Sequence, residues 1–168
     1  MSTVSAQPMT LLRFDFAELY ERHLCRHSQW GNNVAHLAAL FGMWFGVYAL
    51  VFYVTQSALV PVAMALAYLT LVAWNAPLRT VIATAVFLAI FLAAVVWIPP
   101  APLWVYVVMI PIFYEIQVYS HKVFTTEKDM TEFNKKYPKG SVLFLILLIF
   151  EVPLVLNYLV FDRKSWVA

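Results

Sequence analysis

The chain has 168 residues, of which 63% are hydrophobic and only 12% are charged. Soluble domains carry about 25% charged residues, so this composition excludes an ordinary soluble domain and indicates a membrane protein. The formal net charge of +2 is too small to suggest a nucleic-acid partner. The lone Cys25 excludes an intrachain disulfide. No polar stretch is long enough for a second domain, so we expect residues 11–168 to form one helical membrane domain.

Residues 1–10 lack the basic start and the small-residue cleavage site of a signal peptide, and we expect them to be a short disordered lead. Residues 11–28 mix charged and apolar side chains, and this segment is too polar to span a bilayer. The apolar spacing here places Leu12, Phe16, Leu19 and His23 on one helical face. The pattern predicts an interfacial helix that lies on the membrane.

Apolar segments fill most of the remaining chain, and an all-α polytopic membrane bundle is therefore the expected fold class. Gly31, Asn32 and Asn33 are expected to break the helix, with an Asn capping the next one. Residues 122–139 form a polar loop that has room for a short helix. Glu151 and Pro153 interrupt the last apolar segment. The five expected segments are residues 34–55, 59–74, 79–98, 103–120 and 141–161.

The basic residues predict the orientation, because Lys and Arg collect on the cytoplasmic side of membrane proteins. With five spans, one face carries nine basic residues and the other carries only Arg163 and Lys164. This bias predicts a cytoplasmic N-terminus. If the last segment is re-entrant instead, Arg163 and Lys164 lie on the same face as the other nine basic residues, and the charge bias is complete. The nine are Arg13, Arg22, Arg26, Arg79, Lys122, Lys128, Lys135, Lys136 and Lys139.

The same orientation places all four histidines in one layer at the cytoplasmic edge. His23 and His27 are four residues apart and share a helical face, which suits chelation. His27 and His36 are nine residues apart, so they converge only if the helix breaks between them. His121 ends the fourth span on the same side. Because neutral imidazole is the commonest metal ligand, we predict a metal site formed by His27, His36 and His121, with His23 as a fourth ligand.

Polar residues near these histidines are predicted to complete the site. Asn32 lies four residues before His36, where it can orient that ring or bind substrate. Gln117 and Tyr114 lie four and seven residues before His121, and the three form a polar stripe that we expect to face the bundle.

Two carboxylates lie inside apolar segments, Glu115 and Glu151. Buried carboxylates are costly in a membrane, so both are functional candidates. The alternative for each is a structural pair with an Arg or Lys, or a hydrogen bond within the bundle. Glu115 lies about 120° around its helix from His121, so it is not an obvious ligand of the same metal.

Two sequence blocks resemble one known family. The stretch HSQWGNNVAH, from His27 to His36, resembles the H-x4-N-x3-H signature of the fungal 2-hydroxy fatty acid dioxygenases that act in phytosphingosine breakdown. Bacterial relatives share this small membrane domain. The stretch QVYSHKVF, from Gln117 to Phe124, looks like the Q-x3-H-x-x-F block of that family. The blocks occur in the family's order, and the resemblance covers about residues 18–160.

The chain also departs from the family. Ser120 stands where the family usually has Gly before the second-block histidine. Thr125 occupies the position of a usual Glu, with Glu127 two residues further on, and the loop to Pro138 is longer. His23 has no clear counterpart. These differences leave the substrate and one site carboxylate open.

The resemblance implies an Fe(II)- and O2-dependent oxidoreductase of lipid metabolism. A 2-hydroxy fatty acid would lose its carboxyl carbon by α-oxidation and leave a fatty acid one carbon shorter. An iron site with open positions can bind the hydroxyl and carboxylate of such an acid. Arg22 or Arg26 would pair with the carboxylate, the acyl chain would slide between the spans, and Glu115 is a further substrate-contacting candidate. A bacterial inner membrane and an endoplasmic reticulum both fit, and the oligomeric state stays open.

Three other functions remain alternatives. Another lipid-modifying metalloenzyme is one, although four histidines and a single HxxxH exclude the full set of boxes of a di-iron desaturase. A non-enzymatic haem or metal-binding membrane protein is the second. The third is a structural adaptor whose histidines are incidental.

Overall fold

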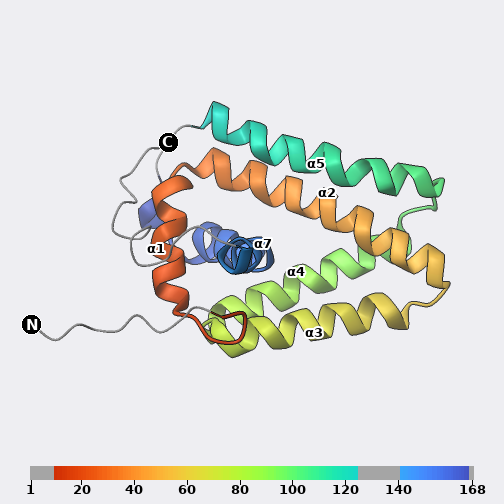
Figure 1. Cartoon of the computed structure of the whole chain (residues 1–168), viewed down its shortest axis with the longest axis horizontal. Coiled ribbons are helices and arrows are strands. Elements are labelled where there is room, and N and C mark those ends of the chain that lie inside the picture. The colour runs from red at the N-terminus through yellow and green to blue at the C-terminus, as the bar shows by residue number, and fades with distance from the viewer. Residues whose placement is uncertain (1–9, 125–140, 167–168) are drawn as a thin grey trace, which may run out of the picture.

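The structure is a computed structural model that describes residues 10–124 and 141–166. These described residues are almost entirely helical and contain no β-strand apart from an isolated bridge between Thr10 and Arg13. The elements form a helical bundle with one helix laid across its end (Figure 1). The predicted all-α fold class is therefore confirmed.

The first helix, α1 (Phe16–Arg26), is the one that crosses the end of the bundle (Figure 1). Asp15 caps it, because its carboxylate accepts hydrogen bonds from the backbone N–H groups of Ala17 and Glu18. The helix buries Phe16, Leu19 and His23 against the bundle, exposes Glu21 and Arg26, and leaves Arg22 partly buried. This is the predicted amphipathic helix, although it is shorter than the polar segment.

Four helices run along the long axis of the molecule: α2 (Trp30–Thr55), α3 (Leu59–Asn75), α4 (Leu78–Trp97) and α5 (Leu103–Val123). In Figure 1, α5 lies along α2, and α3 lies beside α4. Of these, α2, α4 and α5 are long and apolar enough to cross a membrane, and α3 is a shorter apolar helix. The first four predicted segments thus occur where the sequence places them.

The break before α2 lies earlier than predicted. The helix already begins at Trp30, so residues 31–33 belong to its first turn and the break falls at residues 27–29. Asn33 does not cap α2. Its side-chain amide donates instead to the backbone carbonyls of His27 and Gln29, and so gives a partner to the His27 carbonyl, which lies in the break.

The last apolar segment forms α7 (Ser141–Leu156), followed by a π-helical turn (Asn157–Phe161) and a short 3-10 turn (Arg163–Ser165). The expected interruption at Glu151 and Pro153 does not occur. Pro153 has no N–H for the carbonyl of Ile149, four residues earlier, and the hydroxyl of Tyr68 donates to that carbonyl in its place (2.9 Å). The helix therefore continues through the proline.

The helix α7 crosses the other helices rather than running beside them. Figure 1 views it almost end on, whereas α2 to α5 lie along the horizontal axis. The composition and length of residues 142–161 would allow a span. The partners of α7 nevertheless lie in the halves of α2, α3 and α4 next to α1, such as Leu40, Val72 and Ala83. The last apolar segment therefore fills one half of the bundle.

The chain after α7 returns to α1. The Tyr20 hydroxyl donates to Asp162 (2.8 Å), and Trp30 lies against Trp166. Arg163 and Lys164 follow Asp162, so they lie at the same end as α1, as expected for the alternative in which the last segment does not span. Residues 125–140, with four of the predicted basic residues, Thr125 and the predicted loop helix, lie outside the described part.

Glycines let α2 and α5 approach closely. A Cβ on Gly46 would lie 2.7 Å from the backbone oxygen of Tyr106, and one on Gly42 would lie 2.4 Å from the ring of Phe113. Small residues four apart are a recurrent interface between membrane helices. This contact sets α5 against α2 along its length and brings the end of α5 to the start of α2.

Candidate metal centre

Three histidines converge where α1, α2 and α5 meet. His27 lies in the break after α1, His36 in the second turn of α2 and His121 in the last turn of α5. One ring nitrogen from each lies within 4.8 Å of the others. Their ring centroids are 4.5 Å apart for His27 and His36, and 4.7 Å apart for His121 and either of them. The prediction that these three histidines come together is confirmed.

His27 is held by its own helix. Its Nδ1 lies 3.3 Å from the carbonyl oxygen of His23, an acceptor, so the ring proton belongs on Nδ1. Its Nε2 then carries a lone pair, and this buried atom has no hydrogen-bond partner among the described residues. A buried lone pair without a partner is costly unless something fills the space that it faces.

His36 is held in the same way by a carboxylate. Its Nδ1 lies 2.9 Å from an Oε atom of Glu151 on α7, while its Nε2 is buried without a partner in the described part of the chain. An imidazole that donates one N–H to a carboxylate presents a more basic second nitrogen, which is the usual arrangement behind a metal-binding histidine. Glu151, predicted as a functional or structural carboxylate, thus serves His36.

The end of α5 is fixed to the start of α2 next to His121. The Ser120 hydroxyl donates to the side-chain oxygen of Asn32 (2.9 Å), and the Asn32 amide donates to the carbonyl of Arg26 (3.4 Å). Asn32 is fully buried and joins α1, α2 and α5. Asn32, a predicted catalytic residue, therefore lies beside the histidines and connects three helices by hydrogen bonds.

His23 lies behind His27 and outside the group of three. The two rings are stacked with centroids 4.3 Å apart. The Nε2 of His23 lies 2.8 Å from the side-chain oxygen of Asn33, so it donates there and is not available to a metal in this arrangement. The geometry favours a supporting position for His23, and its role as a fourth ligand stays a prediction.

The site favours neutral imidazoles. Burial lowers the pKa of His23 to about 4, although its hydrogen bond to Asn33 opposes the shift. Burial, and the neighbouring charges of His23, His36 and His121, hold the pKa of His27 well below its ordinary value. Only the neutral ring offers a lone pair to a metal, so these surroundings keep the ligand His27 ready to bind.

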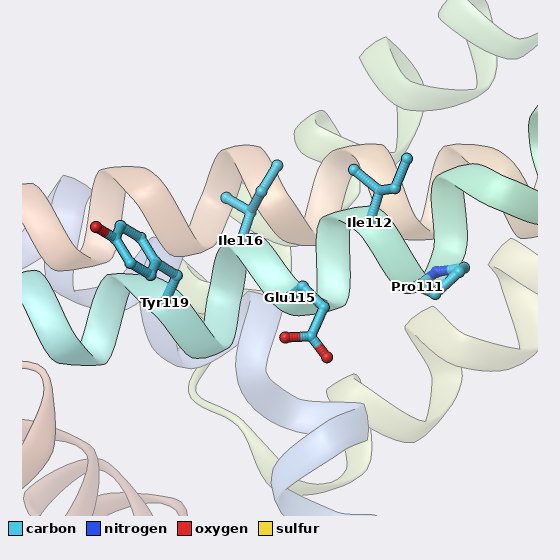
Figure 2. Close-up of a pocket in the computed structure, with 5 residues that line it drawn as sticks. All are labelled: Pro111, Ile112, Glu115, Ile116 and Tyr119. Carbon is cyan, nitrogen blue, oxygen red and sulfur yellow. The ribbon is translucent and has the colours of Figure 1, made fainter.

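The other predicted residues of α5 lie further out. Tyr114 is 46% exposed and Gln117 is half-buried, so the predicted polar stripe follows an edge of α5 instead of facing the bundle. Glu115 is exposed and lines a shallow hollow with Pro111, Ile112, Ile116 and Tyr119 on the helix surface (Figure 2). Glu115 is not among the residues grouped with the three histidines.

The two predicted arginines lie on α1 at the same end. Arg26 is close enough to His121 to interact electrostatically with it, and Arg22 interacts in the same way with Glu151. Both therefore place positive charge at the edge of the centre, where an anionic group of a ligand would lie.

The residues present fit a metal ion. Two histidines with buried, unpartnered nitrogens lie close to a third imidazole, and both buried rings are oriented by a hydrogen bond at the opposite nitrogen. Sequence reasoning missed Asn33 and Ser120 as supports. The position of Asn33, ten residues after His23 and inside a predicted break, gave no helical signal of that contact.

Compared with protein-family models, with curated proteins and with solved structures, this chain shows no match.

Proposed function

We propose that the protein is an Fe(II)-dependent membrane dioxygenase that shortens 2-hydroxy fatty acids by one carbon. The observation that carries this proposal is the pair of buried, unpartnered Nε2 atoms of His27 and His36, two residues that lie close to His121. The two motif blocks of the resemblance contribute these same three histidines. The choice of iron and of a lipid substrate rests on that resemblance and on the surrounding apolar bundle.

The reaction balances without a further reductant. A 2-hydroxy acid, R–CH(OH)–COOH, reacts with O2 to give R–COOH, CO2 and H2O. The C1–C2 bond breaks, C2 is oxidised to the new carboxyl carbon, and O2 accepts the four electrons. Fe(II) held by the three imidazoles would supply the activation of O2 and a Lewis acid for the hydroxyl and carboxylate.

The protein's own residues would bind and orient the polar head of the substrate. Arg26, beside His121, is placed to attract the carboxylate, and Arg22 adds positive charge from the preceding turn of α1. Glu151 would keep His36 oriented through its Nδ1. Asn32 and Ser120 would keep the end of α5, and hence His121, at the same distance from α2.

We place this end of the bundle, with the N-terminus, on the cytoplasmic side. Arg22 and Arg26 on α1, Arg79 at the start of α4, and Arg163 and Lys164 after α7 all lie at the α1 end. This follows the rule that basic residues mark the cytoplasmic face. A bacterial inner membrane and an endoplasmic reticulum both remain consistent with it.

The arrangement of the rings favours this proposal over a haem protein. A bis-histidine haem needs two rings on opposite faces of a flat macrocycle. Here three ring centroids lie 4.5–4.7 Å apart, which leaves no slot for a macrocycle between any two rings. A lipid-modifying enzyme that uses another metal at the same site remains the second candidate.

The test is turnover by the purified protein, loaded anaerobically with Fe(II) and then given O2 and 2-hydroxyhexadecanoic acid. We expect pentadecanoic acid and CO2 in equal amounts, detected by mass spectrometry. His121→Ala should abolish the product, whereas Lys122→Ala, an exposed neighbour, should retain it. Absence of any shortened acid from an iron-loaded protein would overturn the proposal.

A further inference from the structure

A second feature of the bundle is an apolar cavity of about 320 Å³, separate from the histidines. Trp44 and Tyr48 of α2 form one wall, and Phe91 of α4 forms another. Tyr68 of α3 and Val152 of α7 close the side nearest the centre. This volume lies within the range of about 300–1,000 Å³ that is usual for small-molecule sites.

The cavity follows from the crossing helix. In Figure 1, α2 separates from α3 and α4 toward the α1 end, and α7 occupies the space between them. Because α7 crosses at that end, it does not fill the deeper part of the same gap, where α2, α3 and α4 provide most of the walls and Val152 of α7 closes one side. Ala67 of α3 lines the cavity and is exposed, so the cavity opens through the face of the bundle there.

The walls accept an apolar guest and offer little to a polar one. Aromatic rings dominate them, and the hydroxyl of Tyr68 is already bound to the carbonyl of Ile149. Apolar cavities of this kind stay dry and take up apolar molecules. The helices around the cavity are apolar segments of a membrane bundle, where the abundant apolar molecule is an acyl chain.

The cavity is also aligned with the histidine centre. His36 and Trp44 lie on the same helix, eight residues apart, which is about 12 Å along the axis. On α7, Glu151 contacts His36 and the next residue, Val152, lines the cavity. Met43, an unbranched and adaptable side chain, packs in the same cluster as Val152. A molecule with a polar head at the centre thus has an apolar site further into the bundle.

We propose that this cavity binds one saturated acyl chain. The chain belongs either to a single-chain acid, which is the substrate if the proposed function holds, or to a neighbouring phospholipid. Only the first source rests on the proposed function. In both cases the side chains of Trp44, Ala67 and Phe91 limit the length of acyl chain that the cavity can enclose.

The test uses Trp44 as a reporter, because bromine atoms quench nearby indole fluorescence. The protein in nanodiscs is titrated with 9,10-dibromooctadecanoic acid and, separately, assembled with a dibrominated phosphatidylcholine. The signal of Trp44 is the difference between the unmodified protein and Trp44→Phe. Ala67→Phe fills the cavity, and Ala89→Phe makes the same change at an exposed position of α4 that does not line it.

We expect the acid to quench most of the Trp44 signal, Ala67→Phe to remove that quenching, and Ala89→Phe to keep it. Quenching by the phospholipid instead assigns the chain to the bilayer and still supports the proposal. Equal quenching of the unmodified protein and of Ala67→Phe, or no Trp44-specific quenching by either probe, would overturn it. The readout requires no metal, so loss of turnover with intact quenching would count against the proposed function alone.

Discussion

The two ends of this bundle are built from different chemistry. Near α1, many polar side chains are buried, and some of them bond across helices, as Ser120 does with Asn32 and Thr80 with Asn157. The buried polar residues among those described are His23, His27, Ser28, Asn32, Asn33, His36, Thr80, Thr84, Ser120 and Asn157. At the opposite end, the described hydrogen bonds are fewer, and apart from the side-chain bond between Tyr53 and Tyr106 they are local. Gln56 bonds within its own turn, and the Tyr106 hydroxyl accepts from the nearby N–H of Ala101.

This difference separates packing from function. Burying a polar group in an apolar membrane protein is costly unless it is fully hydrogen-bonded. The far end joins its helices with few such groups. The buried polar groups near α1 are therefore not needed for helix packing alone. The buried Nε2 atoms of His27 and His36, which have no partner among the described residues, point to a ligand.

The largest expected effect comes from disturbing the contact that connects the two ends. Gly46→Val places a side chain against the backbone oxygen of Tyr106, which cannot rotate away. Overpacking of this kind costs about 1–3 kcal/mol, and we expect α5 to separate from α2 and metal binding to be lost. Ala38→Val, at an exposed position of α2, is the matched control for thermal unfolding and metal content. Equal behaviour of both variants would contradict the close α2–α5 contact.

A smaller effect is expected from the carboxylate behind His36. Glu151→Gln keeps the size of the side chain and an acceptor for the Nδ1 proton but removes the charge. Loss of such outer partners weakens metal binding by about 10–100-fold, and a chelator competition titration measures it. Glu115→Gln, on the exposed face of α5, should leave the affinity unchanged. The pairing is refuted if the two variants bind metal alike.

Removing the hydrogen bond between Ser120 and Asn32 should have a moderate effect on stability. Ser120→Ala deletes the hydrogen bond to Asn32 and leaves that buried oxygen without its donor. We expect a loss of about 1–3 kcal/mol in the free energy of unfolding. Thr55→Ala removes an exposed hydroxyl that bonds its own helix at the far end, and surface changes of that kind stay within about 0.5 kcal/mol. Similar losses in both variants would remove the contrast between the ends.

The smallest effect is expected at the far turn itself. Gln56 has φ 51°, in the left-handed region that favours glycine. Gln56→Gly relieves that strain but increases the entropy of the unfolded chain, so we expect a stabilisation of at most about 1 kcal/mol and no change in metal content. A strong loss of metal in this variant would show that the far end also shapes the centre.

Much of this architecture follows from local sequence. Runs of apolar residues and the prolines and polar turns between them place α2 to α5 within a few residues. The order of the predicted spans, with a helix break before the first, groups His27, His36 and His121 at one end. The crossing of α7 could not be predicted from the sequence, because a 20-residue apolar stretch has the same composition whether it spans a membrane or lies across the other helices. The hydrogen-bond partners of His23 and His36 could not be predicted either, because only the tertiary fold brings Asn33 to His23 and Glu151 to His36.

The central claim is that three particular imidazoles hold one metal ion, and metal content tests it most directly. The protein is purified in detergent without oxygen, supplied with Fe(II), desalted and measured by mass spectrometry beside four single His→Ala variants. We predict about one ion per chain in the unmodified protein and loss of that ion on changing His27, His36 or His121. Retention in His23→Ala would place that ring behind the centre, and loss there would make it a fourth ligand. No bound metal in the unmodified protein, or metal retained in all four variants, would contradict the account.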